Sequence, residues 1–406
     1  MSLFAALRMP REVLFGVGQR RGLGLVARRY GRRVLVCTDS RLAADPVFAE
    51  MLGLLRAEGL DVRVDSSVQP DVPVATVSES ASAAQDFHPE IVVAIGGGSC
   101  LDLAKSVALL LTHGGIPQDY YGEFKVPGPI LPVVAVLTTA GTGSEVTPVA
   151  VLSDPERALK VGISSPYLIP QAAICDPELT LSCPAGLTAV AGADALTHAV
   201  EAFTAIRREP SAALAHERVF VGKSAITDHF ALLAIGLLST SLERACANGS
   251  DIAARSDVML GALAAGMAFG TAGTAAAHAI QYPIGAITHT AHGLGVACVL
   301  PYVMRFNRDS RLSEFAQIAR AMGLAGASED ALADAAIARV AQIYAAIGIP
   351  ANLDTLGLPA EKLGWVSQQA LGVGRLINNN PRLIDAAGMD QVLRAAHIGD
   401  LEAAAH

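Results

Sequence analysis

The sequence predicts an α/β N-terminal domain built on a parallel sheet, followed by an all-α C-terminal domain. In the first half, short apolar runs alternate with helix-favouring segments, the pattern expected of consecutive βαβ units. Beyond about residue 183 the strand-type runs stop, and alanine-rich helical patterns continue to the end. The 406 residues are enough for two domains with sizeable cores. We therefore predict domains at 1–183 and 184–406.

Four runs in the first domain are predicted to be strands: 34–38, 61–65, 91–95 and 133–137. The last two are apolar throughout, as expected of strands in a parallel sheet that is covered on both faces. Helices are predicted between the strands, at 42–58, 74–85 and 102–111. Because parallel strands need crossover connections, these helices are expected to cover both faces of the sheet.

The second domain is predicted to be a helical bundle. Its expected helices are 185–204, 225–247, 251–269, 272–284, 311–322, 328–346, 359–372 and 388–396. Between the first two, the segment 205–223 is polar and irregular in pattern, so we expect a loop inserted between helices.

Composition restricts the possible partners and the location. The net charge is −8 and no long basic run is present, which argues against nucleic acid as a partner. No stretch of 18 residues is strictly apolar, so no membrane span is predicted. The six cysteines are scattered without a C-x-x-C spacing, which indicates buried thiols in a reducing cytoplasm rather than disulfides or a zinc knuckle.

A run of three glycines, Gly96 to Gly98, follows the strand predicted at 91–95 and leads through Ser99 into a helix. Glycines let a backbone approach a pyrophosphate closely, and the helix N-terminus offers unpaired N–H groups to the anion. The alternative is a tight strand-to-helix turn without a ligand. The run does not match the G-x-G-x-x-G fingerprint, so a standard Rossmann site is not predicted.

Two further segments could contact a nucleotide. Asp39 follows the first clear strand, where a carboxylate can accept from ribose hydroxyls and would repel a 2′-phosphate, which favours NAD over NADP. Asp39 is also a good N-cap for the next helix, and both roles can hold together. The run 138–147 is rich in threonine and glycine, and its hydroxyls suit a ribose, a phosphate or an amide; alone, it is a polar turn.

Four residues of the second domain form a candidate metal site. Asp194 and His198 are four apart in a helix-favouring run, which places both side chains on one face of a helix. His278 and His292 could complete a set of three imidazoles and one carboxylate, which suits Fe(II) or Zn(II). Taken singly, the Asp–His pair is more often a cap or a solvated pair, and a histidine such as His278 is more often a core residue.

In combination, these motifs resemble the iron-dependent (group III) alcohol dehydrogenase family. The glycine run with Asp102 and Lys105, the threonine-rich run and the four candidate ligands occur in the family's order. The segments 176–180 and 378–382 are also similar, so the resemblance covers nearly the whole chain. It implies a dehydroquinate synthase-like architecture: a dinucleotide-binding α/β domain, a helical domain, and an active site in the cleft between them.

The resemblance also implies residue roles. The metal ligands would be Asp194, His198, His278 and His292. The pyrophosphate loop would be Gly97, Gly98 and Ser99, and further cofactor contacts would come from Thr138, Thr139, Thr147 and Lys160, the last near the nicotinamide ribose. Asp39 matches the position associated with NAD preference.

Tyr282 departs from the family pattern. Many members have a second histidine four residues after the third ligand, near the reacting oxygen, and this chain has Tyr282 there. A tyrosine hydroxyl can pass a proton to an alkoxide, although its unperturbed pKa is near 10; it can equally only shape the pocket. The run after Gln281 and the 205–223 insertion look more like the hydroxyacid–oxoacid transhydrogenase branch.

The function implied is reversible hydride transfer between NAD and an alcohol/aldehyde pair, with Fe2+, or alternatively Zn2+, polarising the substrate oxygen. The alternative is a hydroxyacid–oxoacid transhydrogenase or a 4-hydroxybutyrate dehydrogenase-type activity. A third interpretation is a metal-free relative of the family, which would use the same cleft to act as a reductase or as a lyase-type synthase. The expected partner is a small-molecule alcohol, aldehyde or hydroxyacid. Because members of the family are commonly dimers or larger, the resemblance also implies a homodimer or larger homo-oligomer.

Overall fold

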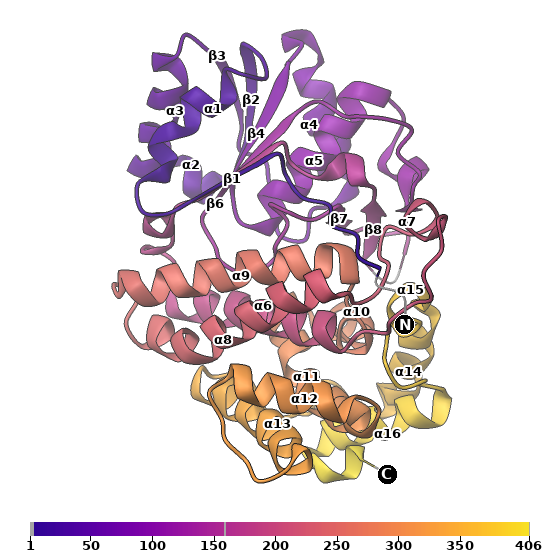
Figure 1. The fold of residues 1–406 in the computed structure, drawn as a ribbon. Helices are drawn as coiled ribbons and strands as arrows, with labels where there is room; N and C mark the ends of the chain where they lie inside the picture. The colour runs from indigo at the N-terminus through magenta and orange to yellow at the C-terminus, as the bar shows by residue number, and fades with distance from the viewer. Residues whose placement is uncertain (1–3, 158–159, 406) are drawn as a thin grey trace. The chain divides into compact units, whose positions relative to one another are not determined.

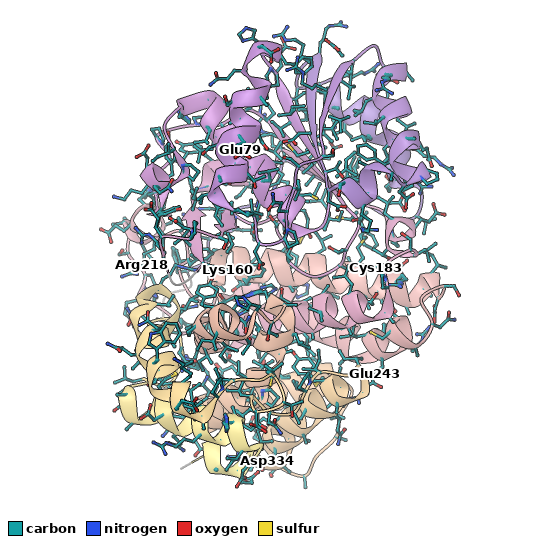
Figure 2. The ribbon with its side chains drawn as sticks, turned by 180° about the vertical axis from the view of Figure 1, so that it is seen from behind. Glu79, Lys160, Cys183, Arg218, Glu243 and Asp334 are labelled. Atoms are coloured by element: carbon teal, nitrogen blue, oxygen red, sulfur yellow. The ribbon has the colours of Figure 1, made fainter. Side chains whose placement is uncertain are left out.

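The computed structural model describes residues 4–157 and 160–405, and within them the chain forms two compact units. The first, here called the α/β unit, comprises Arg8–Cys183 together with the short segment His216–Val219. The second, here called the helical unit, comprises the described residues before Arg8, Pro184–Ala215, and the chain from Phe220 onward. Cys183, after which the chain enters the helical unit, is labelled in Figure 2.

The α/β unit is built on a six-stranded parallel sheet (Figure 1). Its strands, in spatial order, are β1 (Glu12–Phe15), β9 (Ala172–Cys175), β6 (Val133–Leu137), β4 (Ile91–Gly96), β2 (Arg33–Cys37) and β3 (Asp61–Asp65). The four predicted strands are confirmed and occupy neighbouring places at β6, β4, β2 and β3. A second, three-stranded sheet has the order β5 (Gly122–Glu123), β8 (Val161–Ser164), β7 (Val149–Leu152), with β7 and β8 antiparallel.

Helices cover both faces of the large sheet, as predicted. One apolar cluster joins α1 (Leu23–Ala27) and α3 (Pro46–Ala57) to one face of the strands, and another joins α4 (Val74–Ala84) and α5 (Gly98–His113) to the other. The single helix predicted at 42–58 is instead two, because α2 (Ser40–Ala43) ends before α3 begins. The Asp45 carboxylate accepts from Val47 N at 2.9 Å and Pro46 opens α3, a strong start signal inside the predicted span.

The helical unit contains every helix predicted for it, together with three that the pattern did not indicate. The predicted ones are α6 (Ala185–Thr204), α8 (Ala225–Ala247), α9 (Ile252–Ala272), α10 (Ala276–Thr288), α12 (Leu312–Ala321), α13 (Glu329–Ala346), α14 (Leu363–Gly372) and α16 (Ala386–Ile398). The additional ones are α7 (Leu214–Glu217) at the boundary with the α/β unit, α11 (His292–Asn307) and α15 (Gly374–Ile377). Short 3-10 turns occur in both units. Those of the α/β unit lie at Gln19–Gly22, Gln85–Phe87, Pro117–Tyr120, Pro166–Leu168 and Pro177–Thr180, and those of the helical unit lie at Arg308–Arg311, Ala360–Lys362 and Glu402–Ala404.

The start of α10 differs from the prediction by four residues. The predicted helix begins at 272, but α9 runs on to Ala272 and the chain then breaks. Gly273 ends α9 with φ 84°, a left-handed conformation that glycine adopts without steric cost. The helix resumes only at Ala276, so the break sets the position of the first turn of α10.

Two helices of this unit, α8 and α9, are long and apolar enough to cross a membrane by length and composition alone. Buried helices of protein cores meet the same criteria. Both helices pack against α6 and against each other, and 67% of the apolar stretch of α9 is buried inside the protein (Figure 1). Their apolar character is therefore accounted for by the core of the helical unit.

Candidate metal centre and cofactor loops

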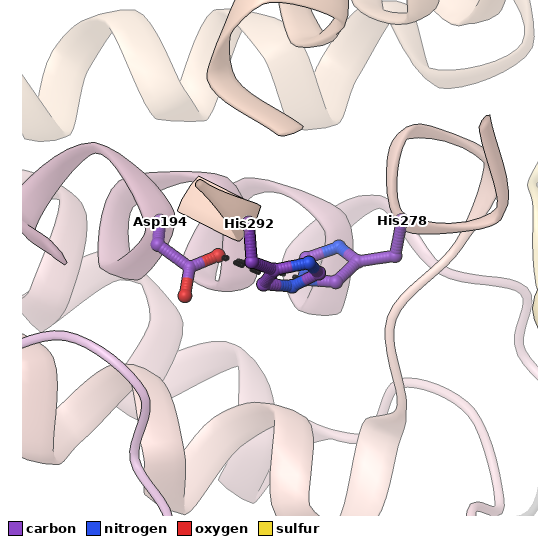
Figure 3. A group of neighbouring side chains, drawn as sticks. All are labelled: Asp194, His278 and His292. Carbon is purple, nitrogen blue, oxygen red and sulfur yellow. Dashed lines mark ion pairs between the residues drawn. The ribbon is translucent and has the colours of Figure 1, made fainter. Parts of the chain in front are cut away.

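The four candidate ligands come together in the helical unit. Asp194 and His198 lie one turn apart in the middle of α6, His278 lies in the first turn of α10, and His292 is the first residue of α11. From the Asp194 Oδ1 atom the Nε2 atoms of His198, His278 and His292 are 3.7, 3.7 and 3.9 Å away. Figure 3 shows Asp194, His278 and His292 converging from three helices.

This donor set fits a divalent transition metal. Asp194, His278 and His292 each offer a ligand atom, and these atoms lie within 4.8 Å of one another. The His278 Nε2 atom is buried and makes no hydrogen bond to any residue that the structure describes. A buried imidazole nitrogen facing a carboxylate and further imidazoles is the environment expected for a ligand of Fe(II) or Zn(II).

Aromatic rings enclose one side of the centre. The His198 ring stacks on Phe269 with centroids 4.1 Å apart, and on the other face it stacks on the His278 ring at 4.7 Å. Phe269 is 6% exposed and lies near the end of α9. This stacking helps to hold the imidazole planes of His198 and His278 in position.

Glu201, to which the sequence analysis assigned no role, holds His278. Its carboxylate oxygen Oε2 lies 2.6 Å from His278 Nδ1 and accepts from Ala275 N at 2.9 Å, while Oε1 accepts from Ala277 N at 2.7 Å. Because a carboxylate accepts only, His278 donates from Nδ1 and presents the lone pair of Nε2 to the centre. The only sequence signal was spacing: Glu201 is seven residues after Asp194, on the same face of α6.

Two glycines allow α11 to approach closely enough to deliver His292. A Cβ on Gly293 would lie 2.4 Å from the Val190 carbonyl oxygen and 2.9 Å from the Asp194 Cβ, both on α6. Two residues further along α11, a Cβ on Gly295 would lie 1.8 Å from Oε1 of Gln281, on α10. At Gly293 the clash is with backbone, so a larger residue would push α11 away from α6, whereas at Gly295 the Gln281 side chain would have to move.

Tyr282 lies next to the centre. It is one turn after His278 on α10, and its ring centroid is 6.2 Å from that of His292. Burial raises the pKa of the Tyr282 hydroxyl, and a hydrogen bond and the positive charge of Arg375 oppose that effect. The net shift is upward, so the hydroxyl carries its proton at neutral pH.

In the α/β unit, the predicted cofactor loops meet at one edge of the sheet. Gly97 and Gly98 follow β4 and open α5, and Thr139 follows β6, the neighbouring strand. A Cβ on Gly97 would lie 3.1 Å from Thr139 Oγ1, and one on Gly98 would lie 2.6 Å from the Thr142 methyl carbon. The glycine run and the threonine-rich run are therefore packed against each other at the carboxyl ends of parallel strands, where open α/β sheets bind ligands.

The remaining predicted cofactor residues lie around these loops. Ser99 is in the first turn of α5, and Thr138 donates from its backbone N to the Gly96 carbonyl oxygen at 3.1 Å. Asp39 follows β2 and caps α2, accepting from Leu42 N at 2.8 Å, so the capping interpretation is confirmed. Lys160, labelled in Figure 2, forms an ion pair with Asp71. Burial raises the pKa of the nearby Asp102 carboxyl, and the positive charges of Lys105 and Lys160 partly oppose that shift.

A network of buried polar side chains holds the threonine-rich loop, residues 138–147, in place. Lys105, on α5, is fully buried and donates to Ser144 Oγ at 2.9 Å and to the Thr147 carbonyl oxygen at 3.0 Å. Asp102, one turn earlier, accepts from Ser144 Oγ at 2.6 Å. Burial lowers the pKa of Lys105 to about 8 and raises that of Glu145 to about 7. Asp102 and Lys105 thus position the loop through which Thr147 passes.

The chain matches two family descriptions that together span most of its length. Residues 10–177 match the family described as iron-containing alcohol dehydrogenase. Residues 188–397 match the C-terminal part of the Fe-containing alcohol dehydrogenase family. The two matched ranges include every candidate ligand and every candidate cofactor residue named above.

Individual proteins are similar over nearly their whole length. The long-chain-alcohol dehydrogenase 1 of Geobacillus thermodenitrificans is 36% identical over 93% of this chain and 92% of its own. The NAD-dependent methanol dehydrogenase of Bacillus methanolicus is 33% identical over 96% of this chain and 98% of its own. A crystal structure of a 1,3-propanediol oxidoreductase superposes with a TM-score of 0.89 at 33% identity, covering 97% of this chain and 100% of that one.

Proposed function

The chain belongs to the family of iron-containing alcohol dehydrogenases, and from that premise we propose that it transfers hydride reversibly between an alcohol and NAD at the centre formed by Asp194 and three histidines. As a member of the family it is an oxidoreductase that acts on CH–OH donors. The observation that carries the proposed site is the convergence of His198, His278 and His292 on one oxygen of Asp194.

The residues of the centre have distinct proposed roles. Asp194, His198, His278 and His292 would hold an iron(II) ion, or zinc(II), which the same donor set accepts. When bound, the metal supplies Lewis acidity toward the substrate oxygen, and NAD supplies the hydride acceptor. Glu201 keeps His278 in the ligating tautomer, and the stacked rings of Phe269 and His198 keep water from that side.

Tyr282 is proposed to exchange the proton that accompanies hydride transfer. Its Oη atom is protonated at neutral pH, and its ring lies 6.2 Å from that of His292. In the direction of aldehyde reduction it could donate to the substrate oxygen. Replacing Tyr282 with Phe would then lower turnover while leaving metal content unchanged.

The cofactor is proposed to be NAD rather than NADP. Asp39 follows β2 beside the glycine run, and a carboxylate there would repel a 2′-phosphate. Gly97, Gly98 and Ser99 would bind the pyrophosphate at the N-terminus of α5. Thr138, Thr139, Thr147 and Lys160 are proposed as further contacts.

The remaining proposals concern organisation. We propose domains at 1–183 and 184–406, a homodimer or larger homo-oligomer, and small-molecule alcohols or aldehydes as substrates. We also propose a cytoplasmic location. It is supported by the buried thiols of Cys37, Cys100, Cys175 and Cys298, and by the packing of α8 and α9 in the core of the helical unit.

One experiment tests the proposed reaction. Iron-reconstituted protein is supplied with a panel of alcohols and 4-hydroxy acids, with and without added NAD, and absorbance is followed at the reduced-nicotinamide band. Turnover that needs added NAD supports the dehydrogenase. Turnover that needs an oxoacid acceptor but no added NAD would replace it with the transhydrogenase, and no turnover with iron or zinc would overturn the redox proposal.

A variant tests the site itself. His278→Ala removes the ligand held by Glu201, so metal retention and turnover are expected to be lost while NAD still binds. His229→Ala, an exposed histidine on α8, is the matched control and should retain both. If His278→Ala kept full metal content and full rate, the ligand assignment would be wrong.

A further inference from the structure

The chain between α9 and α10 contains polar backbone groups that neither helix can pair. α9 ends at Ala272 and α10 begins at Ala276, so the α9–α10 break comprises residues 273–275. The last carbonyl groups of a helix and the first N–H groups of the next have no partner inside their own helices. Ala275, which precedes α10, has no side-chain oxygen that could cap them. Because the break is buried, these groups need partners from elsewhere in the protein.

Two buried side chains supply those partners, one for carbonyl groups and one for an N–H group. The Asn379 Nδ2 atom donates to the Ala272 carbonyl oxygen at 3.0 Å and to the Thr274 carbonyl oxygen at 3.1 Å. The Glu201 carboxylate accepts from Ala275 N at 2.9 Å. A side-chain amide nitrogen has two hydrogens, so Asn379 uses both of its donors on this part of the backbone.

One peptide group links Asn379 to Glu201. The Thr274 carbonyl group and the Ala275 N–H group belong to the same peptide plane, which is rigid. Its oxygen accepts from Asn379, and its N–H donates to Glu201 Oε2. The same Oε2 atom lies 2.6 Å from Nδ1 of His278, which is drawn in Figure 3. A continuous series of hydrogen bonds therefore runs from Asn379, through one peptide group and one carboxylate, to a candidate metal ligand.

Asn379 is itself fixed by contacts that do not involve the break. Its backbone N donates to the Leu376 carbonyl oxygen in α15 at 3.1 Å, and its carbonyl oxygen accepts from Ile206 N, just after the end of α6, at 3.1 Å. α15 packs against α10 (Figure 1). The Asn379 side chain is 3% exposed, and a Cβ on Gly273 would lie 3.0 Å from its Nδ2 atom. The amide is thus held firmly against the break, entirely within the helical unit.

We propose that Asn379 is a positioning residue for the metal centre, which acts on His278 through the 274–275 peptide group and Glu201. The inference rests on the proposed function, because it takes His278 to be a metal ligand. Without Asn379, two buried carbonyl oxygens would lack donors, which is unfavourable. Rotation of the peptide group toward another donor would turn the Ala275 N–H away from Glu201. The carboxylate that orients His278 would then be less firmly held.

Two neighbouring asparagines separate positioning from general stability. Asn379→Ala removes the donors to the break, and Asn380→Ala is the matched control. Asn380 is 4% exposed and exchanges two hydrogen bonds, of 2.8 and 2.9 Å, with Asn307, which lies at the opposite end of α11 from His292. Each variant leaves buried polar groups without partners, so both should lower the thermal unfolding midpoint by on the order of 5 °C.

Metal affinity distinguishes the two variants. Zinc(II) is titrated into each full-length protein in competition with a chelator of known affinity. Asn379→Ala should bind zinc(II) about 10-fold more weakly than the wild type, as when partners of a ligating histidine are changed, and Asn380→Ala should stay within about twofold. The absorption spectrum of bound cobalt(II), which reports coordination geometry, should change only in Asn379→Ala. If both variants lost affinity equally, or neither did, Asn379 would be a structural residue and the inference would be overturned.

A proton signal keeps this inference separate from the proposed function. The Nδ1 proton of His278, hydrogen-bonded to Glu201, should give a far-downfield NMR resonance in metal-free protein, identified by its loss in Glu201→Gln. Asn379→Ala should shift or broaden this resonance, and Asn380→Ala should leave it in place. If the wild type bound neither metal, the metal centre of the proposed function would be wrong and the resonance alone would decide. A resonance that is absent from the wild type, or unchanged in Asn379→Ala, would overturn the inference whatever the metal result.

Discussion

At the residue scale, Glu201 should control metal affinity without touching the metal. Glu201→Gln keeps the size of the side chain but replaces the carboxylate that accepts from His278 Nδ1 at 2.6 Å. The imidazole would then be less basic and less firmly oriented. We expect the affinity for Fe(II) or Zn(II) to fall about 10- to 100-fold, the range seen when such partners of a ligating histidine are changed. Competition with a chelator of known affinity measures it.

Glu243→Gln supplies the control for that measurement. Glu243, labelled in Figure 2, lies on α8 and pairs with Arg339 at 3.0 Å on the surface of the helical unit. Its replacement removes the same charge from the same unit and should leave metal affinity unchanged. Equal affinities of wild type and Glu201→Gln would show that the hydrogen bond to His278 has no part in ligation.

The sequence could predict the ligands but not the groups that position them. Asp194 and His198 share a helix, so their spacing alone places them on one face. Glu201 acts through its contact with His278, which lies 77 positions away in the chain, and no local pattern contains that contact. The capping role of Asp39 was predictable because its partner, Leu42, is three residues away.

At the scale of elements, the approach of α11 to α6 should depend on Gly293. In Gly293→Ala the new Cβ would lie 2.4 Å from the Val190 carbonyl oxygen, so α11 must move away and carry His292 with it. We expect a loss of about 1–3 kcal/mol in unfolding free energy, as for other overpacked sites, together with weaker metal binding. Urea unfolding and chelator competition measure the two effects.

Gly364→Ala is the matched control for the α11 prediction. Gly364 lies within α14, and a Cβ there would meet nothing within 4 Å. Alanine favours helix over glycine, so this variant should be neutral or slightly more stable. If Gly293→Ala matched it in stability and in metal affinity, the close approach of the two helices would be unnecessary for the site.

The threonine-rich loop should give the α/β unit a pH-dependent stability. Burial raises the pKa of Glu145 from 4.5 to about 7, so the folded state favours the protonated acid. That stabilising contribution is complete below about pH 4.5 and is lost as the pH rises through about 7. In Glu145→Gln the neutral amide does not titrate, so this pH-dependent loss of stability does not occur in the variant. Between about pH 5 and 7 its unfolding free energy should rise relative to wild type by about 2 kcal/mol.

Urea unfolding at the two pH values, followed by circular dichroism, checks the Glu145 prediction. Lys105, with a pKa of about 8, remains mostly protonated across that window, and groups other than Glu145 are common to both proteins. A difference between variant and wild type that stays constant with pH would show that Glu145 is ionised in the folded protein at both values.

Elements were predictable where local pattern and tertiary role agree. The strands β4 and β6 are apolar throughout because both faces are buried, and this was visible in the sequence. By contrast, β9 consists of Ala172–Cys175, with only one β-branched residue, and is a strand because β1 and β6 pair with it. The helix α11 contains Pro301, which opposes a helix locally, and the helix forms because it is buried in the core.

At the scale of the whole molecule, the candidate ligands for metal and for cofactor belong to different compact units. Every candidate metal ligand lies in the helical unit, and every candidate cofactor residue lies in the α/β unit. Near residue 183 the sequence changes from alternating strand and helix patterns to helical patterns alone, and this change indicated two domains. It could not indicate that the segment His216–Val219 groups with the α/β unit, because that depends on contacts such as Val219 N donating to Glu123 at 2.6 Å.

This division predicts that metal and NAD stabilise different parts of the chain. A ligand that binds only the folded state at about 100 times its Kd stabilises what it binds by about 2.7 kcal/mol.

The single tryptophan, Trp365, lies on α14 and reports on the helical unit, whereas exchange of the amide hydrogens of β4 reports on the α/β unit. Zinc(II) should raise the Trp365 unfolding midpoint and leave β4 protection nearly unchanged. NAD should do the reverse, and chelation of the metal should lower only the first. Equal shifts of both signals with either ligand would mean that the units unfold as one, and the independence inferred from their separate cores would be wrong.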